Sequence, residues 1–144
     1  GLYPTATVQA EKTIDLKPVM SLHSRLIHVK KIPAGESISY GKTYTTEKEE
    51  WIGTVPLGYA DGIRRHLQGM DVLVNGERAT IVGRICMDQF MVRLNQPCPV
   101  GAKVTLIGEQ DNNVITMDEV ADKLDTINYE VACMFSERIP RIYK

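Results

Sequence analysis

Three short segments of the sequence combine residue types that could carry out chemistry. In residues 39–44, Tyr40 stands directly before Gly41 at the expected end of a strand, which places a phenol on an exposed rim. An unperturbed tyrosine titrates at about pH 10, so Tyr40 could remove a proton at neutral pH only beside a cation or a stabilising network. The simpler interpretation is a half-buried tyrosine that bonds to backbone, and residue types alone favour it.

The second segment is residues 58–62, in which two glycines bracket Tyr59, an alanine and an acid, with Arg64 and Arg65 following closely. Such a pattern is typical of a tight loop, and a neighbouring arginine pair suits a carboxylate or a phosphate. A turn with a solvated basic end explains the same spacing. The segment contains neither of the two glycine patterns that cradle nucleotide phosphates.

The third segment, residues 83–89, contains Cys86 followed by a methionine and an aspartate. A nucleophilic cysteine needs an activating base, and the sequence does not place His23, His28 or His66 beside it. A small buried side chain with an inert sulfur is the better interpretation of Cys86. The backbone N–H groups of this loop are better candidates for binding an anion, and the scattered histidines predict no metal site.

The elements that must position these segments are mainly strands. A strand is expected over residues 18–29, followed by a type I turn at residues 32–35, after which Ile38 and Tyr40 would share one face of a second strand. Asn75-Gly76 predicts a tight hairpin of the type I′ class. Further strands are expected at residues 51–55, 72–74, 79–82, 89–94 and 104–107.

Helical patterns occur only late in the sequence. Thr116 and Glu119 form a potential capping box at the start of one helix, and a second short helix is expected over residues 127–135, with Pro140 ending it. The fold class expected is therefore mainly β, a closed or sandwiched β-barrel domain with one or two short helices near the C-terminus.

Composition narrows the classes of function. The 144 residues are 43% apolar and 24% charged, which fits one domain, and the net charge of −1 favours neither nucleic acid nor an anionic membrane as a partner. Three cysteines without a Cys-x-x-Cys spacing fit a reducing, cytoplasmic location. There is no apolar run long enough for a membrane span. Residues 1–6 fit the end of an upstream segment, and they fit equally well a tag residue followed by a disordered terminus.

Taken together, the segments resemble the C-terminal domain of bacterial alanine racemases, which are pyridoxal-phosphate enzymes that interconvert L- and D-alanine. The resemblance rests on residues 39–44, 58–62 and 83–89, and on residues 126–130 together with 138–141. It implies that residues 1–12 are the tail of an absent upstream α/β barrel and that residues 13–144 form the C-terminal β domain. It also implies a cytoplasmic homodimer that supplies D-alanine for peptidoglycan.

The same resemblance implies roles for individual residues. Tyr40 would be the base that takes the α-proton of L-alanine in the partner subunit's site, while a barrel lysine acts on the opposite face. The backbone N–H of Met87 would meet the substrate carboxylate, and the hydroxyl of Tyr129 would reach the cofactor phosphate. Four residues would line the entrance corridor: Tyr59, Arg65, Arg84 and Asp88.

The lysine that forms the Schiff base lies outside this sequence, so the chain alone is expected to be inactive and to hold pyridoxal phosphate poorly. Within the same architecture, a serine racemase or an amino-acid decarboxylase remains an alternative. A decarboxylase would not need Tyr40 as a two-way proton carrier, and Tyr129 would crowd a side chain larger than that of alanine. From a different class, a non-catalytic β-barrel module for binding or dimerisation also remains.

Overall fold

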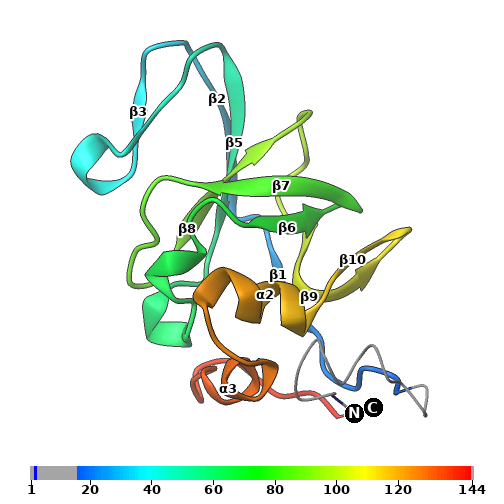
Figure 1. Cartoon of the computed structure of the whole chain (residues 1–144). Helices are drawn as coiled ribbons and strands as arrows, with labels where there is room; N and C mark the ends of the chain where they lie inside the picture. Colours follow the sequence, from blue (N-terminus) through cyan, green and yellow to red (C-terminus); the bar gives the residue numbers. More distant parts are fainter. Residues whose placement is uncertain (1, 3–15, 144) are drawn as a thin grey trace.

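One curved antiparallel sheet dominates the computed structural model, which describes residues 2 and 16–143 (Figure 1). The sheet has eight strands in the order β1-β9-β6-β7-β8-β5-β2, with β10 beside β9, and β3 and β4 form a separate hairpin. The strands are β1 Leu22–Arg25, β2 His28–Ile32, β3 Ser37–Ile38, β4 Tyr44–Thr45, β5 Glu50–Val55, β6 Asp71–Val74, β7 Glu77–Val82, β8 Phe90–Leu94, β9 Lys103–Gln110 and β10 Asn113–Ile115. The helical elements are η1 Tyr40–Lys42, η2 Tyr59–Asp61, η3 Arg65–Leu67, α2 Met117–Leu124 and α3 Asn128–Cys133.

The mainly β fold class is confirmed, and so are the later strands predicted from the sequence. Asn75 and Gly76 adopt φ values of 47° and 81°, and Val74 faces Glu77 across the hairpin between β6 and β7. Positive φ at both central positions is the requirement of the type I′ turn that the two residues predicted. The five expected strands from residue 51 to residue 107 correspond to β5, β6, β7, β8 and β9.

The single strand predicted over residues 18–29 is instead two strands. The chain bends at Leu26, which is 1% exposed and packs into the main core between β1 and β2. The Leu26 N–H donates to Ala102 O at 2.9 Å beside β9, while the Ile27 N–H donates to Thr54 O at 2.9 Å on β5. Consecutive residues of the bend thus bond toward opposite edges of the sheet. Within the described residues the two outermost strands, β1 and β2, are not hydrogen-bonded to each other. The sheet therefore encloses its core as a sandwich.

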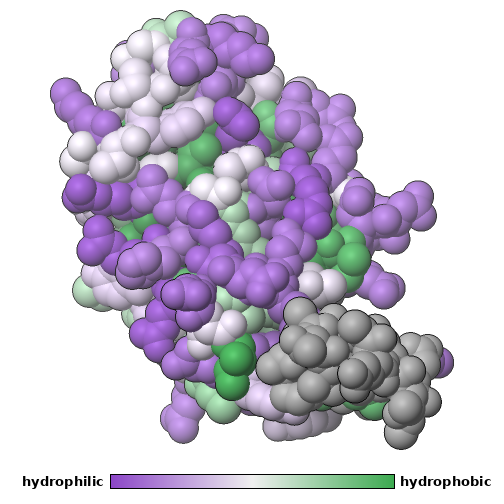
Figure 2. Space-filling model, viewed as in Figure 1, coloured by the Kyte–Doolittle hydropathy of each residue, from purple (hydrophilic) through white to green (hydrophobic). Residues whose placement is uncertain are grey.

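Apolar residues of the inward faces form that core, which α2 covers on one side (Figure 1). Thr116 Oγ1 accepts a hydrogen bond from the Glu119 N–H at 3.0 Å, so the predicted N-cap of α2 is confirmed. The helix buries Met117 and Val120 against the sheet. Polar residues cover most of the face shown in Figure 2, and apolar residues there lie in small separate patches.

The second helix is present but shorter than predicted. α3 ends at Cys133, well before Pro140, so proline does not terminate it. The following backbone packs on another loop instead, because the Ser136 N–H donates to Asp61 O at 3.1 Å. Gly62 permits this approach, since a Cβ there would lie 2.2 Å from Met134 O.

Tyr40 does not lie on a strand, in contrast to the prediction. β3 ends at Ile38, and Ser39 takes φ 68° and ψ 173°, which turns the chain from β3 into η1, the connection between the two strands of the hairpin. The hairpin is anchored by a small second core of Ile32, Ile38, Ile52 and Val82. The short helical turn η1 is therefore the tip of the β3–β4 hairpin, which leaves the end of the long β2–β5 pair (Figure 1).

Two loops that lie far apart in sequence are joined through their backbones at Gly58. The Tyr59 N–H donates to Cys86 O and the Ala60 N–H to Met87 O, both at 3.0 Å. A Cβ on Gly58 would lie 2.2 Å from Met87 O and 2.3 Å from Cys86 O. Gly58 has φ −147°, which any residue can adopt. The glycine is therefore required by space and not by its backbone conformation.

Replacing Gly58 by alanine is expected to lower the free energy of unfolding by about 3–5 kcal/mol, because overpacking costs about 1–3 kcal/mol and two backbone hydrogen bonds would be lost. Urea unfolding of the chain measures this change. Gly101→Ala is the control, since nothing lies within 4 Å of its Cβ position and only its φ of +89° is unfavourable. A loss for Gly58→Ala no larger than that for Gly101→Ala would contradict the steric argument.

Candidate functional site

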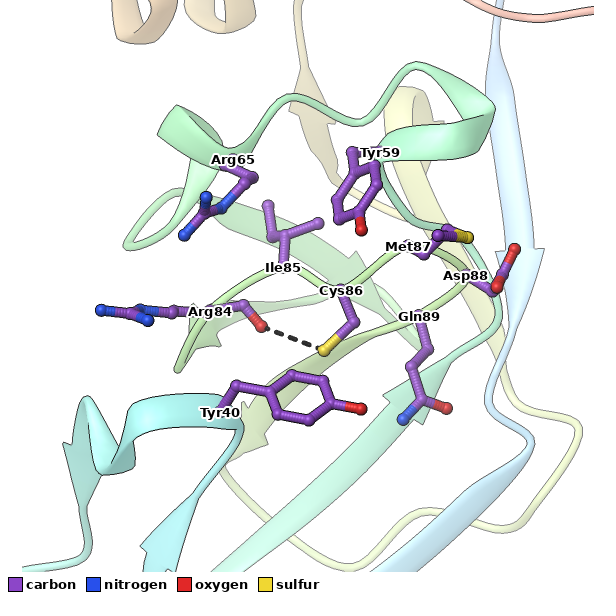
Figure 3. A pocket seen from close by; sticks show the side chains of 9 residues that line it. All are labelled: Tyr40, Tyr59, Arg65, Arg84, Ile85, Cys86, Met87, Asp88 and Gln89. Atoms are coloured by element: carbon purple, nitrogen blue, oxygen red, sulfur yellow. Dashed lines mark hydrogen bonds between the residues drawn. The ribbon is translucent and has the colours of Figure 1, made fainter.

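An open hollow of about 530 Å³ collects most of the residues that the sequence singled out (Figure 3). Its lining residues are Tyr40, Tyr59, Arg65, Arg84, Ile85, Cys86, Met87, Asp88 and Gln89. Six of the seven predicted site residues are among them, and only Tyr129 is absent. The sequence did not assign a role to Ile85 or Gln89, although both lie in the third motif.

The hollow is built where three chain segments meet: η1, the loop with η2 and η3, and the loop between β7 and β8. In Figure 3, Tyr40 lies on one side and Tyr59 on the other, with Cys86 between them. Tyr40 is 75% exposed. The half-buried tyrosine bonded to backbone, which the residue types favoured, is therefore not what the structure shows.

The other tyrosine of the same motif has a different environment. Tyr44 is partly buried, and its hydroxyl donates to Glu50 Oε2 at 2.5 Å. Burial, together with this hydrogen bond, raises the pKa of Tyr44, so its hydroxyl stays protonated at neutral pH. Tyr44 is thus a structural hydrogen-bond donor at the base of the hairpin, whereas the phenol of Tyr40 faces the hollow.

A positive charge lies against the turn that carries Tyr40. The Arg84 guanidinium packs on Gly41, where a Cβ would lie 3.0 Å from Nη1. Arg65 lines the same hollow from η3. Two arginines at the mouth of an open hollow favour the approach of a carboxylate, because guanidinium groups bind planar anions through paired hydrogen bonds.

The Met87 loop presents backbone to this hollow. The Cys86 N–H donates to Gln89 O at 2.9 Å, and the carbonyls of Cys86 and Met87 are taken by the loop that begins at Gly58. Within the part of the chain that the structure describes, the Met87 N–H has no hydrogen-bond partner. Met87 is 53% exposed and lines the hollow.

Arg138 holds the two loops together, and sequence reasoning assigned it no role. Its Nη2 donates to Asp88 Oδ1 at 2.7 Å, and its Nε lies 3.3 Å from Oδ1 of the buried Asp61. The hydrogen bond to Asp88 and the charge of Asp61 raise the pKa of Arg138. Asp61 Oδ2 accepts from the Gly58 N–H at 2.8 Å, which satisfies its second oxygen. In the sequence, the motif at residues 138–141 pointed to Arg138, but it did not indicate which acidic residues Arg138 would pair with.

The structure gives Cys86 no activating base. No histidine among the described residues lines the hollow, and Cys86 Sγ donates to Arg84 O at 3.6 Å. Residues 16–143 contain no cluster of three His, Cys, Asp or Glu side chains that could hold a metal ion. In the same part of the chain, no helix has the length and apolar character needed to cross a bilayer.

Tyr129 lies apart from the hollow. It belongs to the first turn of α3, is 45% exposed, and its hydroxyl lies 3.5 Å from Leu2 O. Figure 1 places α3 and η1 at opposite ends of the molecule. Tyr40 and Tyr129 therefore do not meet within one chain. The predicted tail, residues 1–12, lies outside the described residues except for Leu2.

Comparison with known proteins identifies the family. The family model for the alanine racemase C-terminal domain matches residues 19–143. Alanine racemase of Geobacillus kaustophilus is 59% identical over 143 residues, which is 99% of this chain and 37% of that protein.

Solved structures agree. The crystal structure of alanine racemase from Bacillus anthracis with bound L-Ala-P has a TM-score of 0.97 and 50% identity, covering 99% of this chain and 37% of that one. A histidine racemase from Leuconostoc mesenteroides has a TM-score of 0.86 and 32% identity, covering 90% of this chain and 35% of that one. The chain thus spans little more than a third of these relatives, and it belongs to the alanine racemase C-terminal domain family.

Proposed function

We propose that residues 13–144 are the C-terminal domain of a pyridoxal-phosphate-dependent alanine racemase, and that Tyr40 is one of its two proton-transfer bases. The observation that carries this proposal is the position of Tyr40, a 75% exposed phenol that faces a hollow also lined by Met87. A second copy of the protein can reach such an exposed phenol, because η1 lies at the tip of a hairpin on the outer side of the domain (Figure 1).

The chemistry of racemisation requires proton donors on both faces of the reacting carbon. The Tyr40 phenolate oxygen takes the α-proton of L-alanine, and the phenol returns it in the reverse direction. The base for the opposite face comes from the upstream barrel. The free N–H of Met87 binds the substrate carboxylate and so fixes the orientation of the α-carbon relative to Tyr40.

The described residues fit the cofactor only in part. No lysine among them lines the hollow, so the Schiff-base lysine belongs to the upstream barrel. Tyr129 presents a half-exposed hydroxyl that can donate to the cofactor phosphate. When bound, pyridoxal phosphate supplies delocalisation of the negative charge that develops at the α-carbon. This chain's own contribution is one phosphate contact, one base and one carboxylate contact.

The separation of Tyr40 from Tyr129 supports a homodimer with shared sites. Because η1 with Tyr40 lies far from α3 with Tyr129 (Figure 1), Tyr40 serves the partner subunit and Tyr129 its own barrel. Arg65 and Arg84, with Tyr59 and Asp88, form the entrance corridor through which the amino acid arrives. The whole protein acts in the cytoplasm, where its D-alanine supplies peptidoglycan synthesis.

Alanine is the preferred substrate in this proposal, because two curated relatives that are 59% identical are named alanine racemases, whereas the histidine racemase is 32% identical. A serine racemase differs from an alanine racemase by one hydroxyl in the substrate. Pocket walls discriminate such a difference by only about 1–3 kcal/mol, and those walls belong largely to the upstream barrel.

Tyr40→Phe in the full-length protein is expected to lower kcat by about 10²–10⁴-fold, because the general base is lost while the ring is retained. The kcat/KM values for L- and D-alanine should fall by the same factor, because their ratio equals the equilibrium constant between the enantiomers, which an enzyme does not change. Cofactor absorbance should remain. The measurement is the initial rate of racemisation followed by circular dichroism.

Tyr44→Phe is the matched control, since it removes a hydroxyl from the same motif. It is expected to lower thermal stability, because Glu50 loses its donor, and to leave kcat within about twofold of the parent. Unchanged rates for Tyr40→Phe in both directions would remove Tyr40 from the mechanism.

The isolated chain is expected to show no racemisation of either enantiomer, because it supplies only one of the two bases. The same assay at high protein concentration, with added pyridoxal phosphate, measures this. The full-length protein at equal concentration is the positive control. Turnover by the chain without its barrel would show that the hollow alone contains a complete site.

A further inference from the structure

Ser39, the residue directly before Tyr40, has an unusual backbone conformation. Its φ of 68° and ψ of 173° lie in a region that glycine adopts almost alone, because a Cβ is strained there. A glycine would occupy the same conformation without strain, because it has no Cβ. Because glycine would be less strained at position 39, the presence of serine indicates that its side chain has a function.

The side chain of Ser39 connects two segments of the hollow. Its hydroxyl donates to Arg84 O at 2.8 Å, and its Oγ lies 3.9 Å from Cys86 Sγ. The contact joins the turn that carries Tyr40 to the loop that carries Met87. A glycine at position 39 would break this connection.

The opposing loop has a space for Ser39. A Cβ on Gly83 would lie 2.7 Å from the Ser39 Cβ and 3.2 Å from Ile38 O. Gly83 therefore lets the serine approach closely enough for its hydroxyl to reach the carbonyl of the next residue along the loop. Ser39 thus makes this contact from a strained backbone conformation, and Gly83 makes room for it by having no side chain.

We propose that Ser39 is a positioning residue, whose hydroxyl fixes the Tyr40 phenol relative to the carboxylate-binding N–H of Met87. The inference rests on the proposed role of Tyr40 as a base. Proton transfer depends steeply on the distance and alignment of the reacting atoms, and a misplacement of about 1 Å can cost about 100-fold in rate. Arg84 also packs on Gly41, but the Ser39 hydroxyl makes the hydrogen bond that joins the residue next to Tyr40 to the Met87 loop, so this contact acts directly on that distance.

The test is Ser39→Gly in the full-length holoenzyme. Because glycine removes the strain as well as the hydroxyl, the melting temperature should stay equal or rise. In contrast, kcat should fall about 10- to 100-fold with KM nearly unchanged, because the interaction matters only when the proton moves. Ser39→Ala, which keeps the strained Cβ and loses the hydroxyl, should show the same loss of kcat with a lower melting temperature.

Isotope effects distinguish positioning from general weakening of the fold. With L-alanine deuterated at the α-carbon, the deuteron passes to Tyr40, so the primary isotope effect on kcat should increase in Ser39→Gly. With D-alanine deuterated at the α-carbon, the deuteron passes to the other base, and the isotope effect should not increase. A merely structural role would leave both isotope effects unchanged.

Ser37→Gly is the matched control on the same hairpin. The Ser37 hydroxyl bonds to Thr45 Oγ1 at 3.2 Å on the exposed surface, away from the hollow. This variant should lose thermal stability and keep the parent's kcat and isotope effects.

The outcomes separate the two proposals. If Ser39→Gly retains the parent's kcat, or loses it without the change in isotope effect, the positioning role of Ser39 is wrong. If Tyr40→Phe is inactive in the same assay, the proposed function stands despite that failure. If Tyr40→Phe remains active, the proposed function itself fails.

Discussion

The backbone contact between the Gly58 loop and the Met87 loop is the constraint on which the hollow depends. Two N–H groups of one loop bond to two consecutive carbonyls of the other, and this is possible only because Gly58 has no Cβ. In this contact the carbonyls of Cys86 and Met87 accept hydrogen bonds, whereas the Met87 N–H has no partner among the described residues. A packing requirement thus determines which backbone groups of the Met87 loop are already paired within the domain.

Electrostatics secures the same arrangement from the C-terminal side. Asp61 is 5% exposed, and a buried carboxylate is stable only when its oxygens are paired. Gly58 and Arg138 pair them, and Arg138 also reaches Asp88 in the Met87 loop. The segment after α3 is therefore part of the site's support, which explains why the helix gives way to irregular backbone before any proline.

Local sequence determined the features that depend on a few neighbouring residues. Asn75-Gly76 specified its hairpin, because few other pairs adopt two positive φ values at low cost. Thr116 specified the start of α2, because its hydroxyl satisfies an N–H that no residue inside the helix can reach. The segments at 39–44, 58–62 and 83–89 also identified the residues of the hollow, since they belong to a recognisable family.

The tertiary structure alone decided how these segments meet. The strand predicted over residues 18–29 is bent at Leu26, because that side chain enters the core while its own N–H and that of Ile27 bond toward opposite edges of the sheet. Tyr40 leaves the predicted strand because Ser39 is held by a carbonyl 45 residues away. Arg138 finds Asp61 and Asp88 only after the chain has folded. Periodicity and turn preference are local properties, whereas these contacts join residues distant in sequence, so only the folded chain determines them.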